Sequence, residues 1–404
     1  MPNSEFRLVN TEAADPRALL PHPRTPERQS HPLELSGAKA AAIAFLLLGL
    51  SIPCRCPAAS DAQAAPSRLP HTNLLVFHKR SGAAAPVKSK SDWQRRRAEI
   101  LRGMTEVMGP LPGREKWCPF DLRTEQRTNC GSYVRLLVTY ASEPGSRVPA
   151  YLLIPNEALN GKKKLPAILA LHSTDMQYGH SVLVEQLRGN YRAFGRDLAE
   201  RGYVVIAPAY PLMADYQPDL KALGYQSGTM KAIRDNMRAL DLLETLSFVR
   251  KGRFGAIGHS LGGHNAIYTA VFDPRISVIV SSCGFDSFSD YYGGDPANWQ
   301  PERGWCQTRY MPRLADYRGR LAEIPFDFYE LIAALAPRPV FVNAPLRDAN
   351  FRQQSVDRIL TAASAVYRLY HVPGVLQAAY PGCDHNFPPE VREAAYNFLD
   401  QHLR

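Results

Sequence analysis

The sequence lacks the patterns that would indicate a metal, dinucleotide or membrane-spanning protein. Its seven cysteines form no C-x-x-C pair, and none has a histidine at a zinc-ligand spacing. No glycine-rich dinucleotide motif and no internal repeat occurs. No apolar run reaches the roughly 18–20 residues of a membrane span. We therefore expect no metal and no cofactor.

Positive charge exceeds negative charge, with a formal net charge of +10, but it is scattered along the chain. The densest basic runs, residues 95–97 and 162–164, are short and lack the interleaved aromatic side chains of a nucleic-acid surface. We interpret them as solvated surface and expect no nucleic-acid partner. A mild attraction to anionic substrates stays open.

The first 65 residues differ from the rest in composition. Residues 1–39 are polar, contain proline and show no periodicity, which predicts disorder. Residues 40–65 hold an apolar stretch followed by small residues, with Ala62-Gln63-Ala64 as a cleavage site. This arrangement predicts a signal peptide or, if it is not cleaved, an anchor, and hence a secreted or periplasmic protein. A buried apolar helix is the alternative.

Residues 66–90 are interpreted as a linker, and residues 91–404 as one α/β domain that begins with a helix over 91–108. Ser91 and Asp92 are its candidate caps, and Gly109 and Pro110 end it.

Strand and helix patterns alternate through this domain. Such alternation predicts a mostly parallel, twisted sheet with helices on both faces and an irregular insertion after residue 283. The expected strands are residues 133–140, 150–154, 166–171, 203–207, 254–257, 276–281, 340–343 and 376–380, and the expected helices are 182–201, 230–249, 328–336, 353–367 and 389–403. The first two strands are joined by a short turn, which indicates an antiparallel edge.

One turn has the composition of a catalytic serine turn. Gly258-His259-Ser260-Leu261-Gly262-Gly263 lies between an expected strand and an expected helix, the context that makes a G-x-S-x-G pattern specific. Glycine allows unusual dihedral angles and close packing of the helix on the strand. The helix N-terminus favours developing negative charge. Ser260 is therefore the candidate nucleophile, and an accidental serine in a glycine-rich turn is the simpler alternative.

A serine nucleophile needs a base, and the base needs an acid to orient it. Asp348 follows the strand 340–343 and His385 follows the last strand, so both lie at carboxyl ends of strands, where the turn also points. The order Ser260, Asp348, His385 suits this architecture. Asp286, after the strand 276–281, is an alternative acid. Asp384 adjoins His385 and is interpreted as loop structure.

The oxyanion donors and the substrate pocket have candidates of their own. The backbone N–H of Leu261, directly after the nucleophile, is one donor, and Ser173 or Thr174 in the loop after 166–171 is the other. Tyr210 is expected in a pocket wall. Aromatic residues of the segment 285–317 could line the pocket or simply pack that segment onto the domain; the candidates are Tyr291, Tyr292 and Trp299. If the protein is exported, Cys118–Cys130 and Cys283–Cys306 are possible disulfides.

These motifs resemble the α/β-hydrolase superfamily, within it the dienelactone hydrolase and acetyl xylan esterase branch, and the catalytic domain of prolyl-oligopeptidase-like enzymes. The resemblance is carried by Gly258–Gly263, by Leu335-Ala336-Pro337-Arg338-Pro339-Val340 and by Asp384-His385-Asn386-Phe387. Dienelactone hydrolases proper use a cysteine nucleophile, so the serine here implies ordinary ester hydrolysis. Where the family's His-Gly-Gly oxyanion loop would stand, this chain has His172-Ser173-Thr174.

The resemblance and the residues together predict a serine esterase that acts on a carboxylic ester, with an acetylated carbohydrate as one candidate substrate. A serine peptidase or thioesterase with the same triad is an alternative. So is a non-catalytic binding module of the same fold.

Overall fold

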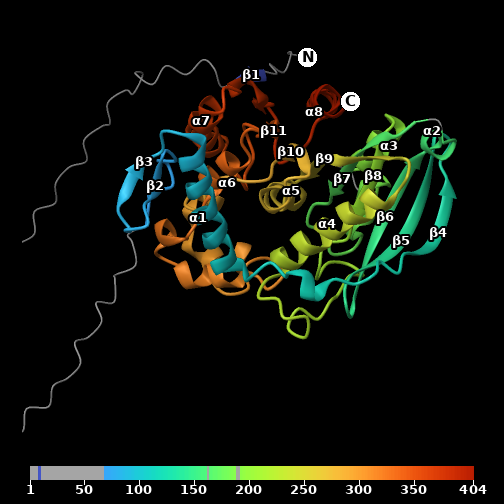
Figure 1. The fold of residues 1–404 in the computed structure, drawn as a ribbon, viewed down its shortest axis with the longest axis horizontal. Coiled ribbons are helices and arrows are strands. Elements are labelled where there is room, and N and C mark those ends of the chain that lie inside the picture. Colours follow the sequence, from blue (N-terminus) through green and yellow to red (C-terminus); the bar gives the residue numbers. More distant parts are fainter. Residues whose placement is uncertain (1–7, 11–67, 162, 188–191) are drawn as a thin grey trace, which may run out of the picture. The chain divides into compact units, whose positions relative to one another are not determined.

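The computed structural model describes residues 8–10, 68–161, 163–187 and 192–404 (Figure 1). The segment 40–65 and most of 1–39 lie outside these residues. Within 1–39 only Leu8–Asn10 is described, and it forms a short strand, which departs from the expectation of disorder at that point. Among the described residues no helix is both long enough and apolar enough to cross a membrane.

A ten-stranded sheet forms the centre of the domain, in the order β1-β12-β11-β10-β9-β7-β8-β6-β5-β4. The strands from β8 to β12 in this order are parallel, whereas β4, β5, β6 and β1 add antiparallel edges, as expected for the first two predicted strands. The strands are β1 Leu8–Asn10, β4 Arg123–Asn129, β5 Tyr133–Glu143, β6 Ser146–Pro155, β7 Leu165–Leu171, β8 Val204–Pro208, β9 Val249–His259, β10 Ile276–Ser282, β11 Val340–Asn343 and β12 Leu376–Ala379.

Helices cover both faces of this sheet, as predicted (Figure 1). Side chains alternate between the faces: Ile168 and Ala170 of β7 pack with α3 and α8, whereas Leu169 and Leu171 pack in the core that holds α4 and α5. The helices are α1 Lys90–Met108, α2 Asn156–Leu159, α3 Phe194–Glu200, α4 Gly228–Thr245, α5 Leu261–Phe272, α6 Phe328–Ala334, α7 Gln353–Leu369 and α8 Pro389–Leu403.

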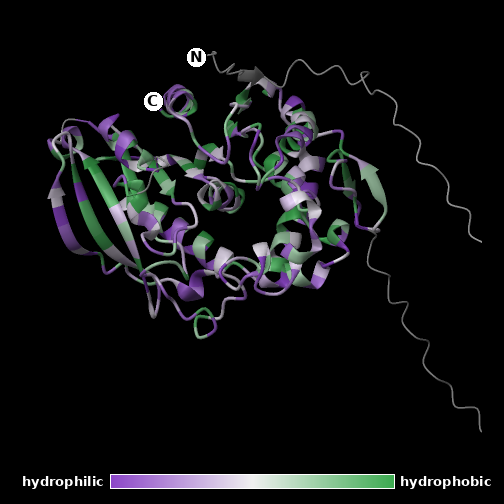
Figure 2. Ribbon diagram, turned by 180° about the vertical axis from the view of Figure 1, so that it is seen from behind, coloured by the Kyte–Doolittle hydropathy of each residue, from purple (hydrophilic) through white to green (hydrophobic). Residues whose placement is uncertain are grey.

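One expected helix and one expected helix cap differ from the structure, and one strand was not expected. The helix expected over 182–201 is a 3-10 turn, Gly179–Leu183, followed by the short α3. Strand β4 was not predicted, because all seven of its residues are polar and it lies at the sheet edge, where Figure 2 shows a largely hydrophilic ribbon. The cap of α1 is Ser89 rather than Ser91 or Asp92, since the Ser89 hydroxyl accepts the N–H of Asp92 at 3.1 Å.

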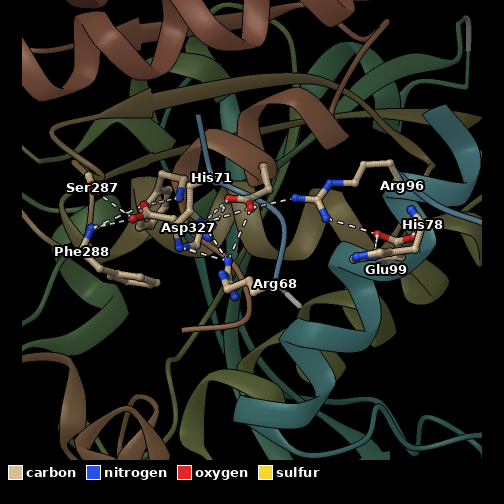
Figure 3. A network of polar contacts seen from close by, with 10 residues as sticks. Arg68, His71, His78, Arg96, Glu99, Ser287, Phe288 and Asp327 are labelled. Atoms are coloured by element: carbon tan, nitrogen blue, oxygen red, sulfur yellow. Dashed lines mark hydrogen bonds and ion pairs between the residues drawn. The ribbon is translucent and has the colours of Figure 1, made fainter. Parts of the chain in front are cut away.

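Within the predicted linker 66–90, the described residues 68–89 form a folded arm. It contains a two-stranded hairpin, β2 Val76–His78 and β3 Ala84–Pro86. Buried charges attach it to the domain (Figure 3): Glu330 of α6 accepts hydrogen bonds from His71 at 2.8 Å and from Arg96 of α1 at 3.1 Å, and Arg68 approaches it to 3.5 Å. Because Glu330 is almost fully buried, these partners supply the compensation that its charge requires.

The insertion after β10 is irregular, as expected. Gly284 to Pro325 contains short 3-10 segments packed by aromatic side chains, namely Tyr291–Gly294, Pro296–Trp299, Gly304–Cys306, Pro312–Tyr317 and Leu321–Glu323. Further 3-10 turns are Arg114–Lys116 and Pro373–Val375.

Candidate active site

Ser260 lies on a strained turn between β9 and α5. Its φ of 55° and ψ of −123° are unfavourable for a residue with a side chain, and such strain is typical of functional turns. The turn is possible because glycine flanks it: a Cβ on Gly258 would lie 2.1 Å from the carbonyl carbon of Gly262, and one on Gly262 would lie 2.0 Å from the oxygen of Leu171. The serine stands directly before the N-terminus of α5.

His385 and Asp348 meet at the same edge of the sheet. Asp348 follows β11 and His385 lies between β12 and α8; the His385 Nδ1–H donates to Asp348 Oδ2 at 2.8 Å. The other oxygen, Oδ1, accepts the N–H groups of Asn350 at 2.8 Å and Phe351 at 3.2 Å. A carboxylate only accepts, so the neutral imidazole carries its proton on Nδ1 and keeps the Nε2 lone pair free for use as a base.

Asp286 and Asp384, the two other carboxylates weighed from the sequence, have different partners. Asp286 accepts the backbone N–H of Arg352 at 3.0 Å, and burial, together with nearby carboxylates, raises its pKa to about 8. Asp384 is exposed and pairs with Arg347 at 3.1 Å. The acid bonded to His385 in this structure is thus Asp348.

A pocket of about 720 Å³ opens above the serine. Its lining combines the candidate nucleophile and base with the loop after β7, which carries Ser173 and Thr174. The lining residues are Ser173, Thr174, Asp175, Met176, Val182, Arg192, His259, Ser260, Asn350 and His385. Leu261, the other oxyanion candidate, is buried as the first residue of α5.

His172 fixes the loop that holds Ser173 and Thr174. Its Nδ1–H donates to the Ser173 carbonyl at 2.8 Å, and its Nε2 accepts the N–H of Tyr210 at 2.9 Å. Burial lowers the pKa of His172 to about 4, so the ring is neutral and can serve as donor and acceptor at once. The Thr174 hydroxyl is also held, within 3.0 Å of the Tyr310 hydroxyl.

The four predicted substrate-binding aromatics are not among the pocket-lining residues. Tyr210 is buried and donates to the Arg309 carbonyl at 3.0 Å. Tyr291 and Trp299 are buried in the aromatic packing of the insertion. Tyr292 is 44% exposed and contacts Tyr291 edge to face. Tyr210, Tyr291 and Trp299 therefore pack the insertion, and Tyr292 is the one exposed residue of the four.

Several pocket residues were not predicted. Arg192 is half-buried and donates to the Asn386 side chain at 3.3 Å, and nothing in its sequence context distinguishes it. Met176 and Asn350 follow predicted strands. Their position at the carboxyl edge of the sheet could therefore have indicated that they lie near the site.

The suggested disulfides are absent. Cys118, Cys130, Cys283, Cys306 and Cys383 are all free thiols, which corrects both the Cys118–Cys130 and the Cys283–Cys306 pairings. Cys283 instead donates its thiol proton to the Asn386 carbonyl at 3.3 Å.

Comparison with known families agrees with this architecture. The dienelactone hydrolase family matches residues 148–292, and the fungal glucuronyl esterase family matches residues 225–370. Among solved structures, the glucuronoyl esterase from Solibacter usitatus superposes with a TM-score of 0.64 at 20% identity, over 84% of this chain and 100% of that one. The chain has the α/β-hydrolase fold. The predicted resemblance to the dienelactone hydrolase branch is therefore confirmed.

Sequence relatives of this chain include YtaP of Bacillus subtilis (strain 168), 27% identical over 319 residues, which are 76% of this chain and 100% of that protein. The 4-O-methyl-glucuronoyl methylesterase 1 of Wolfiporia cocos (strain MD-104) is 26% identical over 180 residues, 41% of this chain and 44% of that enzyme. Together the families and relatives support the expectation of a carboxylic ester hydrolase.

Proposed function

We propose that this α/β-hydrolase is a serine esterase that cleaves a carbohydrate carboxylic ester through an acyl-enzyme, with Ser260, His385 and Asp348 as its triad. The observation that carries the proposal is the bond of His385 to the buried Asp348, at the edge of a pocket that Ser260 also lines. The serine needs a base with a free ring nitrogen, and this bond leaves Nε2 in that form.

The proposed reaction has two halves. His385 accepts the Ser260 proton through Nε2 while the serine oxygen attacks the ester carbonyl, and the imidazolium then protonates the leaving alcohol. A water activated by the same nitrogen hydrolyses the acyl-enzyme. Asp348 stays ionised, orients the ring and stabilises its charged form.

The oxyanion of the tetrahedral intermediate needs two donors. The N–H of Leu261 is the first candidate, because it belongs to the first turn of α5, where backbone N–H groups lack helical acceptors. The loop of Ser173 and Thr174 is the source of the second. The neutral His172 keeps this loop in one position against the Tyr210 backbone.

A carbohydrate substrate is favoured by the names of the relatives and by the lining of the pocket. One relative, 26% identical over 172 residues, is named a carbohydrate esterase, and the Wolfiporia cocos relative is named a glucuronoyl methylesterase. Hydroxyl, carboxyl, guanidinium and amide groups line the pocket, through Ser173, Asp175, Arg192 and Asn350, and such groups can bind sugar hydroxyls. Two substrate types follow: an acetylated sugar, and a methyl ester of a uronic acid.

A substrate panel tests the function directly. Acetylated xylo-oligosaccharides, methyl glucuronate esters, p-nitrophenyl acetate, peptide amides and acyl-CoA thioesters are compared with the purified protein and with Ser260→Ala. We expect turnover of the sugar esters and its loss in the folded variant. Turnover of amides or thioesters alone favours the peptidase or thioesterase alternative, and no turnover favours a binding module.

We infer export from the segment 40–65. Amino-terminal sequencing of protein recovered from outside the cytoplasm is expected to begin at Ala65, directly after the cleavage motif. Recovery of the intact segment in a membrane fraction identifies an anchor instead.

A further inference from the structure

A cysteine that the proposed reaction does not use lies beside the proposed acid and base. Cys283 directly follows β10, has a φ of 48°, and donates its backbone N–H to the Asn343 carbonyl at 2.8 Å. Its side chain is buried, and its sulfur lies 3.3 Å from the carbonyl oxygen of Asn386, next to His385. The backbone thus holds the thiol close to the pair formed by Asp348 and His385.

Three different metal-ligand types converge at this point. The sulfur of Cys283, a carboxylate oxygen of Asp348 and a ring nitrogen of His385 all lie within 4.8 Å of one another. Zinc binds these donors at roughly 2.0–2.3 Å, and neighbouring ligands of a tetrahedral ion are then roughly 3.3–3.8 Å apart. Small side-chain shifts are enough to bring the three atoms around one ion.

We propose that Cys283, Asp348 and His385 form an inhibitory site for Zn²⁺ and similar soft divalent ions. A thiolate and a carboxylate balance the charge of the ion, and the imidazole supplies a neutral third ligand. The Asn386 carbonyl oxygen, already next to the sulfur, is available as a fourth. Of the three side chains, His385 is the most exposed, at 24%, so the ion enters from the pocket past this ring.

Binding there disables the base, a consequence that rests on the proposed function. The ion binds to Nδ1 of His385 and replaces the hydrogen bond that this nitrogen now makes to Asp348. The thiol proton leaves to solvent, and the imidazole proton moves from Nδ1 to Nε2. Nε2 then holds a hydrogen and cannot accept the Ser260 proton, so the metal-bound enzyme is inactive until the ion is removed.

The binding test does not depend on catalysis. The purified metal-free protein is titrated with Cd²⁺, and the near-ultraviolet thiolate-to-metal charge-transfer band is measured. Cys283→Ser removes the proposed sulfur ligand, whereas Cys306→Ser removes another buried free thiol. Cys383→Ser removes a half-buried free thiol from the loop next to His385. We expect the band in the parent protein, in Cys306→Ser and in Cys383→Ser, and its loss in Cys283→Ser.

The activity test uses Zn²⁺ and p-nitrophenyl acetate, with each variant referred to its own metal-free rate and its fold checked by circular dichroism. We expect inhibition that a chelator reverses, and at least about a tenfold higher inhibitory concentration for Cys283→Ser than for Cys306→Ser. A band unchanged in Cys283→Ser, or lost in Cys383→Ser instead, overturns the site. A protein that shows the band but hydrolyses no ester refutes the proposed function and leaves the site standing.

Discussion

Replacement of Asp348 by asparagine removes the acceptor that faces His385 Nδ1 while it keeps the size and shape of the side chain. Asp348 Oδ1 accepts two backbone N–H groups, and Oδ2 accepts the His385 Nδ1–H at 2.8 Å. An asparagine that keeps its oxygen toward the two backbone donors turns its NH₂ toward Nδ1. Two N–H groups cannot face each other at this distance, so the imidazole proton moves to Nε2 and the base is lost.

The expected cost is large. An Asp-to-Asn exchange of this kind in a serine triad lowers kcat about 10⁴-fold, equivalent to about 5.5 kcal/mol of transition-state stabilisation. The assay is p-nitrophenyl acetate hydrolysis by purified Asp348→Asn, with its fold checked by circular dichroism. Asp384→Asn is the matched control, because Asp384 is exposed and pairs with Arg347. It is expected to keep kcat within about twofold.

The variant Asp286→Asn tests whether Asp286 is the acid instead of Asp348. Asp286 bonds the Arg352 backbone and not His385. We therefore expect Asp286→Asn to keep more than a tenth of the parent activity. If Asp348→Asn keeps that much activity while Asp286→Asn loses about 10⁴-fold, the acid that orients His385 is Asp286 and not Asp348.

Three further predictions concern stability. Ser89→Ala removes the cap of α1 and is expected to lower the free energy of unfolding by about 1 kcal/mol. The control Ser91→Ala is expected to lower it by less than about 0.5 kcal/mol. Equal effects of the two variants in urea titrations would contradict the assignment of Ser89 as the cap. The raised pKa of Asp286 means that its carboxyl binds a proton more tightly in the folded state, so this group alone lowers the free energy of unfolding by up to about 1.4 kcal/mol per pH unit as the pH rises from about 4 to about 8. Asp286→Asn lacks this slope, and a stability difference that stays constant over that range refutes the assignment. Gly262→Ala places a Cβ 2.0 Å from the Leu171 oxygen, and we expect a loss of at least about 1–3 kcal/mol; an unchanged Tm argues against the tight turn.

Helices and strands were predictable where one of their faces is buried, because burial requires apolar residues at a regular spacing. The expected bounds of β11 and α8 agree with the structure, and β7 and β10 differ by one residue at one end. These segments are apolar or amphipathic and bounded by turn residues, so their pattern reports the core directly. The turn at Ser260 was predictable for another reason, because the close approach of its backbone to neighbouring backbone requires glycine at Gly258 and Gly262.

Features that depend on distance in space were not predictable. Asp286 and Asp348 both follow strands that end at one edge, and sequence order alone left both possible as the acid. The free thiol of Cys283 was misassigned to a disulfide because spacing gives no distance between sulfurs. The helix expected over 182–201 contains Gly189-Asn190, a turn-favouring pair that the apolar periodicity concealed.

The proposed mechanism requires that Ser260 is a nucleophile activated by His385. Labelling of the purified protein with a fluorophosphonate probe, followed by peptide mass spectrometry, shows whether this serine is reactive. We expect one covalent adduct on Ser260, formed in parallel with the loss of esterase activity, and a strongly slowed reaction in His385→Ala. An unlabelled Ser260 in the folded protein, or an adduct on another residue that accompanies the loss of activity, would rule out Ser260 as the nucleophile.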